Sequence, residues 1–219
     1  MTMHPTRQRL LERGLTLARE KGLRGVTVRE LAASAGANLG TFVYHFGNRD
    51  RFIEELVELW YAPLYAQLRD LAGAASGQTA LERLDSTLWA LLQWALAHAD
   101  IVAHLVADAL QGEPGVRAFA VRLPRRHPLL LLRLLREAQA EGSLAPGPAL
   151  PRLLFLMAAT GLPLVLTSTL GERDWMPRLR WFHHHARHPE ALRQRLDWAL
   201  RGLQGPGASS VTCPSEVCP

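Results

Sequence analysis

Apolar side chains recur every three or four residues along almost the whole chain, and no segment alternates convincingly between apolar and polar residues. This spacing places apolar side chains on one face of a helix, whereas alternation would predict a strand. The sequence therefore predicts an all-α protein. Glycine, proline and capping residues divide the pattern into separate helices. We expect helices near residues 6–21, 28–35, 38–47, 49–73, 79–98, 101–111, 114–123, 128–141, 148–170, 174–183 and 189–203.

The charge of the chain is concentrated near its N-terminus. Of 219 residues, 48% are hydrophobic, which is enough to bury a core, and the formal net charge is +5. Residues 1–50 hold eight Lys or Arg against four Asp or Glu. A basic segment on a nearly neutral body predicts an anionic partner at that end of the molecule.

Other features of the sequence indicate a soluble cytoplasmic protein. The N-terminus lacks a signal-type apolar run, and the two cysteines, Cys213 and Cys218, lie in the final seven residues. Segment 153–170 is uncharged and just reaches the length of a membrane span. It stands alone and contains six Thr, Ser, Gly or Pro residues, so we favour a buried helix and expect no membrane partner.

Residues 28–47 have the pattern of a helix-turn-helix. Two short helices flank Gly36, and such a unit places its second helix in the DNA major groove. Phe42 and Phe46 are four residues apart and can pack inward, whereas small or polar groups begin the second helix, where base edges would be reached. The N-terminus of the following helix offers a dipole suited to a phosphate.

The segment from Val26 to Arg51 resembles the DNA-binding signature of TetR/AcrR-type transcriptional regulators. The similarity extends over about residues 6–57, roughly a quarter of the chain. Two positions depart from the family pattern: Val43 stands where a tyrosine is frequent, and Arg49 replaces the usual lysine. The matching residues are Thr27, Arg29, Leu31 and Ala32 in the first helix, Gly36 in the turn, Gly40-Thr41-Phe42 and Tyr44-His45-Phe46 in the second helix, and Asn48-Arg49-Asp50 after it.

This resemblance implies a homodimeric repressor that binds a palindromic double-stranded DNA operator and is released by a small-molecule inducer. It implies a helix-turn-helix domain over residues 1–48 and a larger helical ligand-binding and dimerisation domain over residues 49–204. The Pro/Gly/Ser-rich tail, 205–219, is expected to be disordered. Carried over by position, the DNA-binding residues are Thr27, Arg29, Asn38, Leu39, Gly40, Thr41, Tyr44, His45 and Arg49.

The C-terminal body gives a weaker signal. A small-molecule pocket is mostly apolar and contains a few polar groups, and the resemblance places it among the helices that follow residue 73. For each candidate alone, an ordinary core or surface role is the stronger interpretation. The candidates for ligand binding are Trp89, Gln93, His104, Asp108, Phe119 and Arg122.

The expected dimer interface combines the apolar helix near 148–170 with the last helix of the chain. The first helix is apolar on more than one face, and the second repeats leucines at helical spacing. Each therefore needs another apolar surface to cover it. The leucines of the last helix that we assign to this interface are Leu192, Leu196, Leu200 and Leu203.

A cluster of histidines leaves an alternative open. His184 and His188 are four residues apart, a spacing that could bind a metal on one helical face, and His183 and His185 adjoin them. A metal-responsive regulator is therefore the alternative function. Because Pro189 follows at once, a helix end is the favoured interpretation, and we expect no metal and no cofactor. No Gly-rich phosphate loop, nucleophile elbow or metal-hydrolase helix occurs, so we expect no enzyme.

Overall fold

The computed structural model describes residues 4–74, 77–170 and 180–204, and every regular element in these ranges is a helix. The predicted all-α class is thus confirmed. The elements are α1 (Pro5–Lys21), α2 (Val28–Ser34), α3 (Leu39–Phe46), α4 (Arg49–Gly73), α5 (Ala80–Ala97), α6 (Ala99–Leu110), α7 (Pro114–Arg122), the short 3₁₀ helix η1 (Leu123–Arg125), α8 (His127–Ala140), α9 (Ala149–Leu170), α10 (Arg180–Arg187) and α11 (Pro189–Arg201).

Most helix ends lie within two residues of their predicted positions. The N-caps form as local chemistry requires: Thr27 accepts a hydrogen bond from the backbone N–H of Glu30 at 3.3 Å, and Asn48 accepts one from Arg51 at 2.9 Å. The sequence did not indicate η1. Part of the helix expected at 174–183 and the whole tail expected to be disordered at 205–219 lie outside the described residues.

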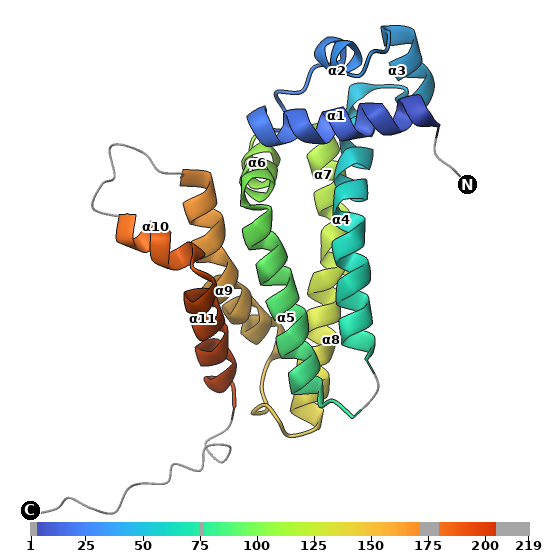
Figure 1. Ribbon diagram of the computed structural model, residues 1–219. Helices are drawn as coiled ribbons and strands as arrows, with labels where there is room; N and C mark the ends of the chain where they lie inside the picture. Colours follow the sequence, from blue (N-terminus) through green and yellow to red (C-terminus); the bar gives the residue numbers. More distant parts are fainter. Residues whose placement is uncertain (1–3, 75–76, 171–179, 205–219) are drawn as a thin grey trace, which may run out of the picture.

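The helices form a small head on a longer body. Helices α1, α2 and α3 lie together at one end, and α4, α5, α7 and α8 run alongside one another beneath them (Figure 1). Helices α9, α10 and α11 lie on the far side of α5 from α4 (Figure 1). The chain bends by 89° between α5 and α6, which brings α6 up against the underside of α1.

One continuous apolar core connects the head to the body, from Leu10 through Phe52 to Leu196. Two glycines allow the closest approaches to α4. A Cβ at Gly14 of α1 would lie 2.5 Å from the Phe52 ring, and one at Gly115 of α7 would lie 2.7 Å from the Asp50 carbonyl oxygen. The proposed boundary at residue 48 coincides with the turn between α3 and α4, but the apolar core is not divided there.

Helix α9 carries an apolar face that the rest of the described chain does not cover. Residues 149–168 are long and apolar enough to span a membrane, yet only 22% of the most apolar window is buried. The inner side of the helix packs on the body through Leu153, Leu156 and Leu164, so burial of this segment is confirmed for that side alone. The exposed side carries Leu150, Leu154, Phe155, Leu162 and Leu166.

The face of the last helix that was expected at the dimer interface is not free. Leu192, Leu196 and Leu200 of α11 are buried within the protomer, in the same core as α5 and α9. Helical spacing shows that these leucines share a face but does not show whether a neighbouring helix or a second chain covers it. The exposed apolar side chain of α11 is Trp198.

Candidate nucleic-acid interface

The turn between α2 and α3 has the geometry of a helix-turn-helix. Gly36 has a φ of +60°, a left-handed conformation that favours glycine, and the backbone N–H of Ala37 returns to the carbonyl of Ala32 at 2.9 Å. Asn38 then caps α3 by accepting a hydrogen bond from the backbone N–H of Thr41 at 2.8 Å. The two helices are therefore joined by a compact, well-bonded turn.

The inner side of α3 is fixed by aromatic packing. Phe42 and Phe46 are buried, and their ring centroids lie 5.5 Å and 4.9 Å from that of Phe52 in α4. Such contacts set the rotation of a short helix about its own axis. The opposite face of α3 must then point away from the protein.

That outer face exposes large side chains. Leu39, Val43 and Tyr44 are 54%, 52% and 84% exposed. Thr41 is half-buried, and its hydroxyl donates to Asn38 Oδ1 at 3.0 Å. Three exposed bulky side chains on one eight-residue helix constitute a surface suited to a partner.

Gly40 lies on the same outer face. A Cβ at this position would meet only Asn38 Oδ1, at 3.3 Å, and the helix has no positive φ here. A methyl group at residue 40 would therefore press on this one side-chain oxygen alone, whereas at residues 14 and 115 it would lie within 2.7 Å of a buried ring or the backbone. A glycine that the fold does not need permits a close approach of another molecule to the backbone.

The first turn of α2 lies next to α3 and contributes Thr27 and Arg29, both exposed. Glu30 does not complete a reciprocal capping box, because its carboxylate pairs with Lys21 of α1. The predicted residues from Thr27 to Tyr44 therefore share the outer surface of the head, which remains a predicted DNA contact surface.

His45 lies at the edge of this surface. It is half-buried, its ring centroid is 5.0 Å from that of His4, and Arg7 is close. Partial desolvation, with the nearby His4 and Arg7, lowers the pKa of His45. A lowered pKa favours the neutral imidazole at pH 7, so His45 would offer a hydrogen bond to a phosphate rather than a charge.

Arg49 is placed differently from the other predicted contacts. Its guanidinium donates to three backbone carbonyls of the α1–α2 turn, those of Leu23, Arg24 and Val26, at 2.8 to 3.1 Å. It also pairs with Glu113 of the body at 2.6 Å. The expected phosphate contact has no support in this geometry, because the side chain is directed into the protein.

The family model for bacterial regulatory proteins of the tetR family matches residues 10–56 of this chain, which include the whole helix-turn-helix. Residues 10–56 of this chain therefore form a TetR-family domain. Among curated relatives, the chain is 30% identical over 107 residues to the HTH-type transcriptional repressor KstR2 of Rhodococcus jostii, covering 47% of this chain and 52% of the repressor. The corresponding repressor of Mycobacterium tuberculosis is 33% identical over 105 residues, or 48% and 51%. The chain thus spans about half the length of the curated relatives it matches.

Solved structures extend the likeness beyond this domain to the body of the chain. The ketosteroid transcriptional regulator KstR2 of Mycobacterium tuberculosis superposes with a TM-score of 0.64 at 22% identity, over 93% of this chain and 97% of that one. A protein of unknown function from Rhodococcus sp. RHA1 gives a TM-score of 0.68 at 26% identity, over 91% and 96%. The described part of the chain therefore has the fold of these two solved proteins.

The structure does not bring the six ligand candidates of the sequence together. Asp108 and His104 lie beside the α1–α2 turn, and Asp108 is bonded to its backbone. Phe119 is buried against Tyr61, whereas Arg122 is exposed and pairs with Glu54 and Glu58. The remaining two candidates are on α5: Trp89 under the guanidinium of Arg193, and Gln93 exposed.

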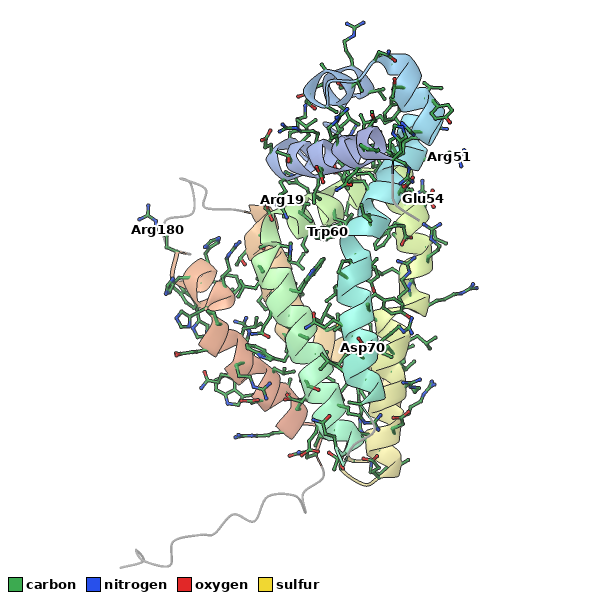
Figure 2. The ribbon with its side chains drawn as sticks, turned by 45° about the vertical axis from the view of Figure 1, so that its right-hand side comes forward. Arg19, Arg51, Glu54, Trp60, Asp70 and Arg180 are labelled. Carbon is green, nitrogen blue, oxygen red and sulfur yellow. The ribbon has the colours of Figure 1, made fainter. Side chains whose placement is uncertain are left out.

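Another group of residues lines a small cavity directly under the head. Its volume is about 10 Å³, and it is enclosed by side chains of α1, the α1–α2 turn, α4 and α6. Trp60 of α4 lies below α1 (Figure 2) and lines this cavity, and its indole Nε1 is buried without a hydrogen-bond partner in the described structure. The lining residues are Leu15, Leu23, Leu56, Val57, Trp60, Ile101 and Leu105.

Sequence reasoning missed Trp60 and its aromatic neighbours. The ring centroid of Trp60 lies 4.4 Å from that of Trp94, which in turn is 4.6 Å from His98 at the α5–α6 bend. The i, i+4 spacing of Trp94 and His98 was a usable signal, because it places both rings on one side of α5. Only the fold shows that Trp60 of α4 joins them.

The histidine cluster does not form a metal site in the described part of the chain. His184 and His188 have ring centroids 5.7 Å apart, but no group of three His, Cys, Asp or Glu side chains there could hold a metal ion. Cys213 and Cys218 lie outside the described residues. A pair of imidazoles alone is an incomplete ligand set, since structural zinc sites have four ligands.

Proposed function

We propose that this chain is a TetR-family transcriptional repressor, rather than an enzyme, that binds operator DNA in the cytoplasm. The observation that carries the proposal is the outer face of α3, where Leu39, Val43 and Tyr44 are exposed around a Gly40 that the fold does not require. The adjacent Thr27, Arg29, Asn38 and Thr41 supply hydrogen-bonding groups, and the curated relatives are named as repressors. Such a helix meets base edges with its N-terminal residues and phosphates with its flanks.

We further propose that the repressor is a homodimer joined through α9. Leu150, Leu154, Leu162 and Leu166 are spaced by multiples of four, and Ala158 and Gly161 lie among them. This ridge of leucines around small residues suits close packing against the same helix of a second copy. A two-fold dimer would present two α3 helices to half-sites about one DNA turn apart, so the operator would be palindromic.

The ligand that releases the operator would bind at the cavity under the head. The lining is apolar, and the buried Trp60 N–H needs an acceptor, so the chemistry favours an apolar molecule with a carbonyl oxygen. The present volume holds about one water molecule. A larger ligand would have to separate α6 from α1 and α4. It would therefore favour a conformation in which the head is oriented differently on the body. One solved relative is named a ketosteroid regulator.

The first experiment is DNA binding to fragments that flank the protein's own gene, at about 50 and about 200 mM salt. We expect tight binding to one fragment with a two-fold footprint. About six phosphate contacts would weaken that binding about a thousandfold between the two salt concentrations. Equal binding to every fragment would contradict an operator-specific repressor and would leave only a basic head.

The ligand site is tested by tryptophan fluorescence with androstenedione as the probe. All six tryptophans lie beyond residue 50, so the signal comes from the body. We expect saturable quenching, release of the operator fragment, and loss of both in Trp60→Phe, which removes the indole N–H and keeps an aromatic ring. Trp198→Phe is the matched control, because Trp198 is exposed on α11. Quenching that persists in Trp60→Phe would place the ligand elsewhere.

A further inference from the structure

Two buried carboxyl groups of the body hold the turn between α1 and α2, residues 22–26. The first is Asp108, 5% exposed in the last turn of α6. Its Oδ2 accepts hydrogen bonds from the backbone N–H groups of Leu23 at 2.8 Å and Arg24 at 3.2 Å. A buried carboxyl group without such partners would be costly, so this side chain ties α6 to the turn.

The second carboxyl group, that of Glu113, acts through Arg49. Glu113 is 6% exposed, stands at the N-cap of α7 and accepts from Arg49 Nη1 at 2.6 Å. The same guanidinium donates from Nε to the carbonyl of Val26 and from Nη2 to that of Leu23, both at 2.8 Å. The planar fork of arginine can join a carboxylate to several carbonyls at once, which a lysine cannot.

The backbone is closely packed where the α1–α2 turn meets α6 and where α7 meets α4. Gly22 has a φ of +78°, and a Cβ there would lie 3.1 Å from His104 Nδ1 and 3.3 Å from Asp108 Oδ2. On the other side, Gly115 brings α7 directly onto the first turn of α4. The end of α6 and the start of α7 therefore meet the underside of the head together (Figure 1).

We propose that Asp108, Glu113 and Arg49 form a clamp on the α1–α2 turn that sets how α2 and α3 are oriented on the body. Arg49 is then a positioning residue for operator binding and not a phosphate ligand. The proposal rests on the proposed repressor function. It also gives the ligand a route to the DNA, because Leu23 of the clamped turn lines the same cavity as Ile101 and Leu105 of α6.

The direction in which one substitution changes DNA affinity distinguishes the two possible roles of Arg49. Glu113→Gln removes a negative charge near the head and keeps the size of the side chain. If Arg49 bound a phosphate, the variant would bind all DNA as well as the wild type or better. If the clamp positions the head, Glu113→Gln weakens operator binding about tenfold and leaves binding to unrelated DNA unchanged.

Arg49→Gln gives the complementary measurement. We expect the same loss of about tenfold on the operator, with an unchanged slope of affinity against salt, because no phosphate contact is lost. A phosphate contact would instead lower that slope by about 0.9 and weaken specific and nonspecific binding alike. The double variant should be no weaker than the weaker single variant, since both break one interaction.

The distance between the two operator half-sites that the protein prefers reports directly on how its two heads are positioned. A rigid pair of heads should prefer the natural operator over one with a single base pair inserted at its centre, and the clamp variants should lose part of this preference. Arg193→Gln is the matched control, because Arg193 pairs with Asp85 and Asp197 on the body, away from the head. It should leave spacing preference and operator affinity unchanged.

Stability must be followed in the same samples. Far-UV circular dichroism melts will show whether each variant is folded at the assay temperature. Asp108→Asn keeps one oxygen to accept from Leu23 and serves as the milder second variant if Arg49→Gln does not fold. Folded clamp variants with wild-type operator affinity and spacing preference would overturn the clamp. Failure of the wild type to bind any operator would instead refute the repressor function.

Discussion

Two helices in the described part of this protein each expose several large apolar side chains, α3 in the head and α9 in the body, and they differ in what surrounds those side chains. On α3, Leu39, Val43 and Tyr44 are mixed with Asn38 and Thr41 on a helix of eight residues. On α9, the exposed leucines extend over a helix of 22 residues whose last 18 residues carry no charge.

The difference indicates two kinds of partner. A short surface with hydrogen-bonding groups and a basic surrounding can match base edges and phosphates. A long uncharged ridge has nothing to offer a phosphate, and in water it is stable only when another apolar surface covers it. Exposure of apolar residues alone would not separate these cases, whereas their polar neighbours do.

The largest effect is expected from a charge placed among the exposed leucines of α9. Leu154→Arg would bury an unpaired charge at each side of the proposed dimer, so we expect self-association at least a thousandfold weaker. The protein should sediment as a folded monomer and lose most of its operator affinity. Vesicle flotation of the wild type provides the competing outcome, since an α9 that binds lipid would bring the protein to the membrane fraction.

Two control variants keep this result interpretable. Leu129→Arg changes a leucine of α8 that is comparably exposed, and it should leave the dimer intact. Leu196→Arg changes a fully buried leucine of α11 and should unfold the protein rather than dissociate it. A folded Leu154→Arg variant that still sediments as a dimer would show that the interface lies elsewhere.

The same comparison explains what the sequence predicted well. In the head, local rules sufficed: Thr27, Asn38 and Asn48 are N-caps, Gly36 has the positive φ of a turn, and Phe42 and Phe46 pack inward. Each of these features depends on residues close in sequence. The helix boundaries and the outer face of α3 could therefore be predicted.

The surroundings of Arg49, Asp108 and the α11 leucines could not be predicted, because they depend on residues far away in the sequence. Arg49 sits where the resembled family usually has a lysine, and its guanidinium pairs with Glu113, 64 residues away. Asp108 looked like a polar group of a pocket, but it bonds a turn 84 and 85 residues away. Helical spacing gives the face of a helix, and only the fold gives what covers that face.

Acid tests the packing between α4 and α8 in the body, away from both exposed faces. Burial lowers the pKa of His127, the first residue of α8, to about 4, and its Nδ1 lies 2.8 Å from the hydroxyl of Tyr61 in α4. The unfolded chain has the ordinary pKa of about 6.5 and therefore binds the proton more readily. Stability from the neutral histidine is present above pH 6.5 and is lost as the pH falls toward 4.

This loss should amount to about 2 kcal/mol in the free energy of unfolding between pH 7 and pH 5. The measurement is urea unfolding at both pH values, with His127→Gln as the comparison, because glutamine keeps a polar group and does not titrate there. The variant should show a smaller pH dependence by about this amount. An equal pH dependence would show that other groups control acid stability.

The smallest effect is expected from a single methyl group added to the outer face of α3. Gly40→Ala should remain folded, because alanine is the better helix former and a Cβ there would press only on Asn38 Oδ1, at 3.3 Å. If DNA approaches the backbone of α3, the methyl group should weaken operator binding about tenfold without changing dimerisation. Gly14→Ala is the matched control, since its Cβ would overlap the Phe52 ring and lower the melting temperature. Unchanged operator affinity in Gly40→Ala would mean that α3 does not approach DNA at its first turn, and the exposed Leu39, Val43 and Tyr44 would then need another partner.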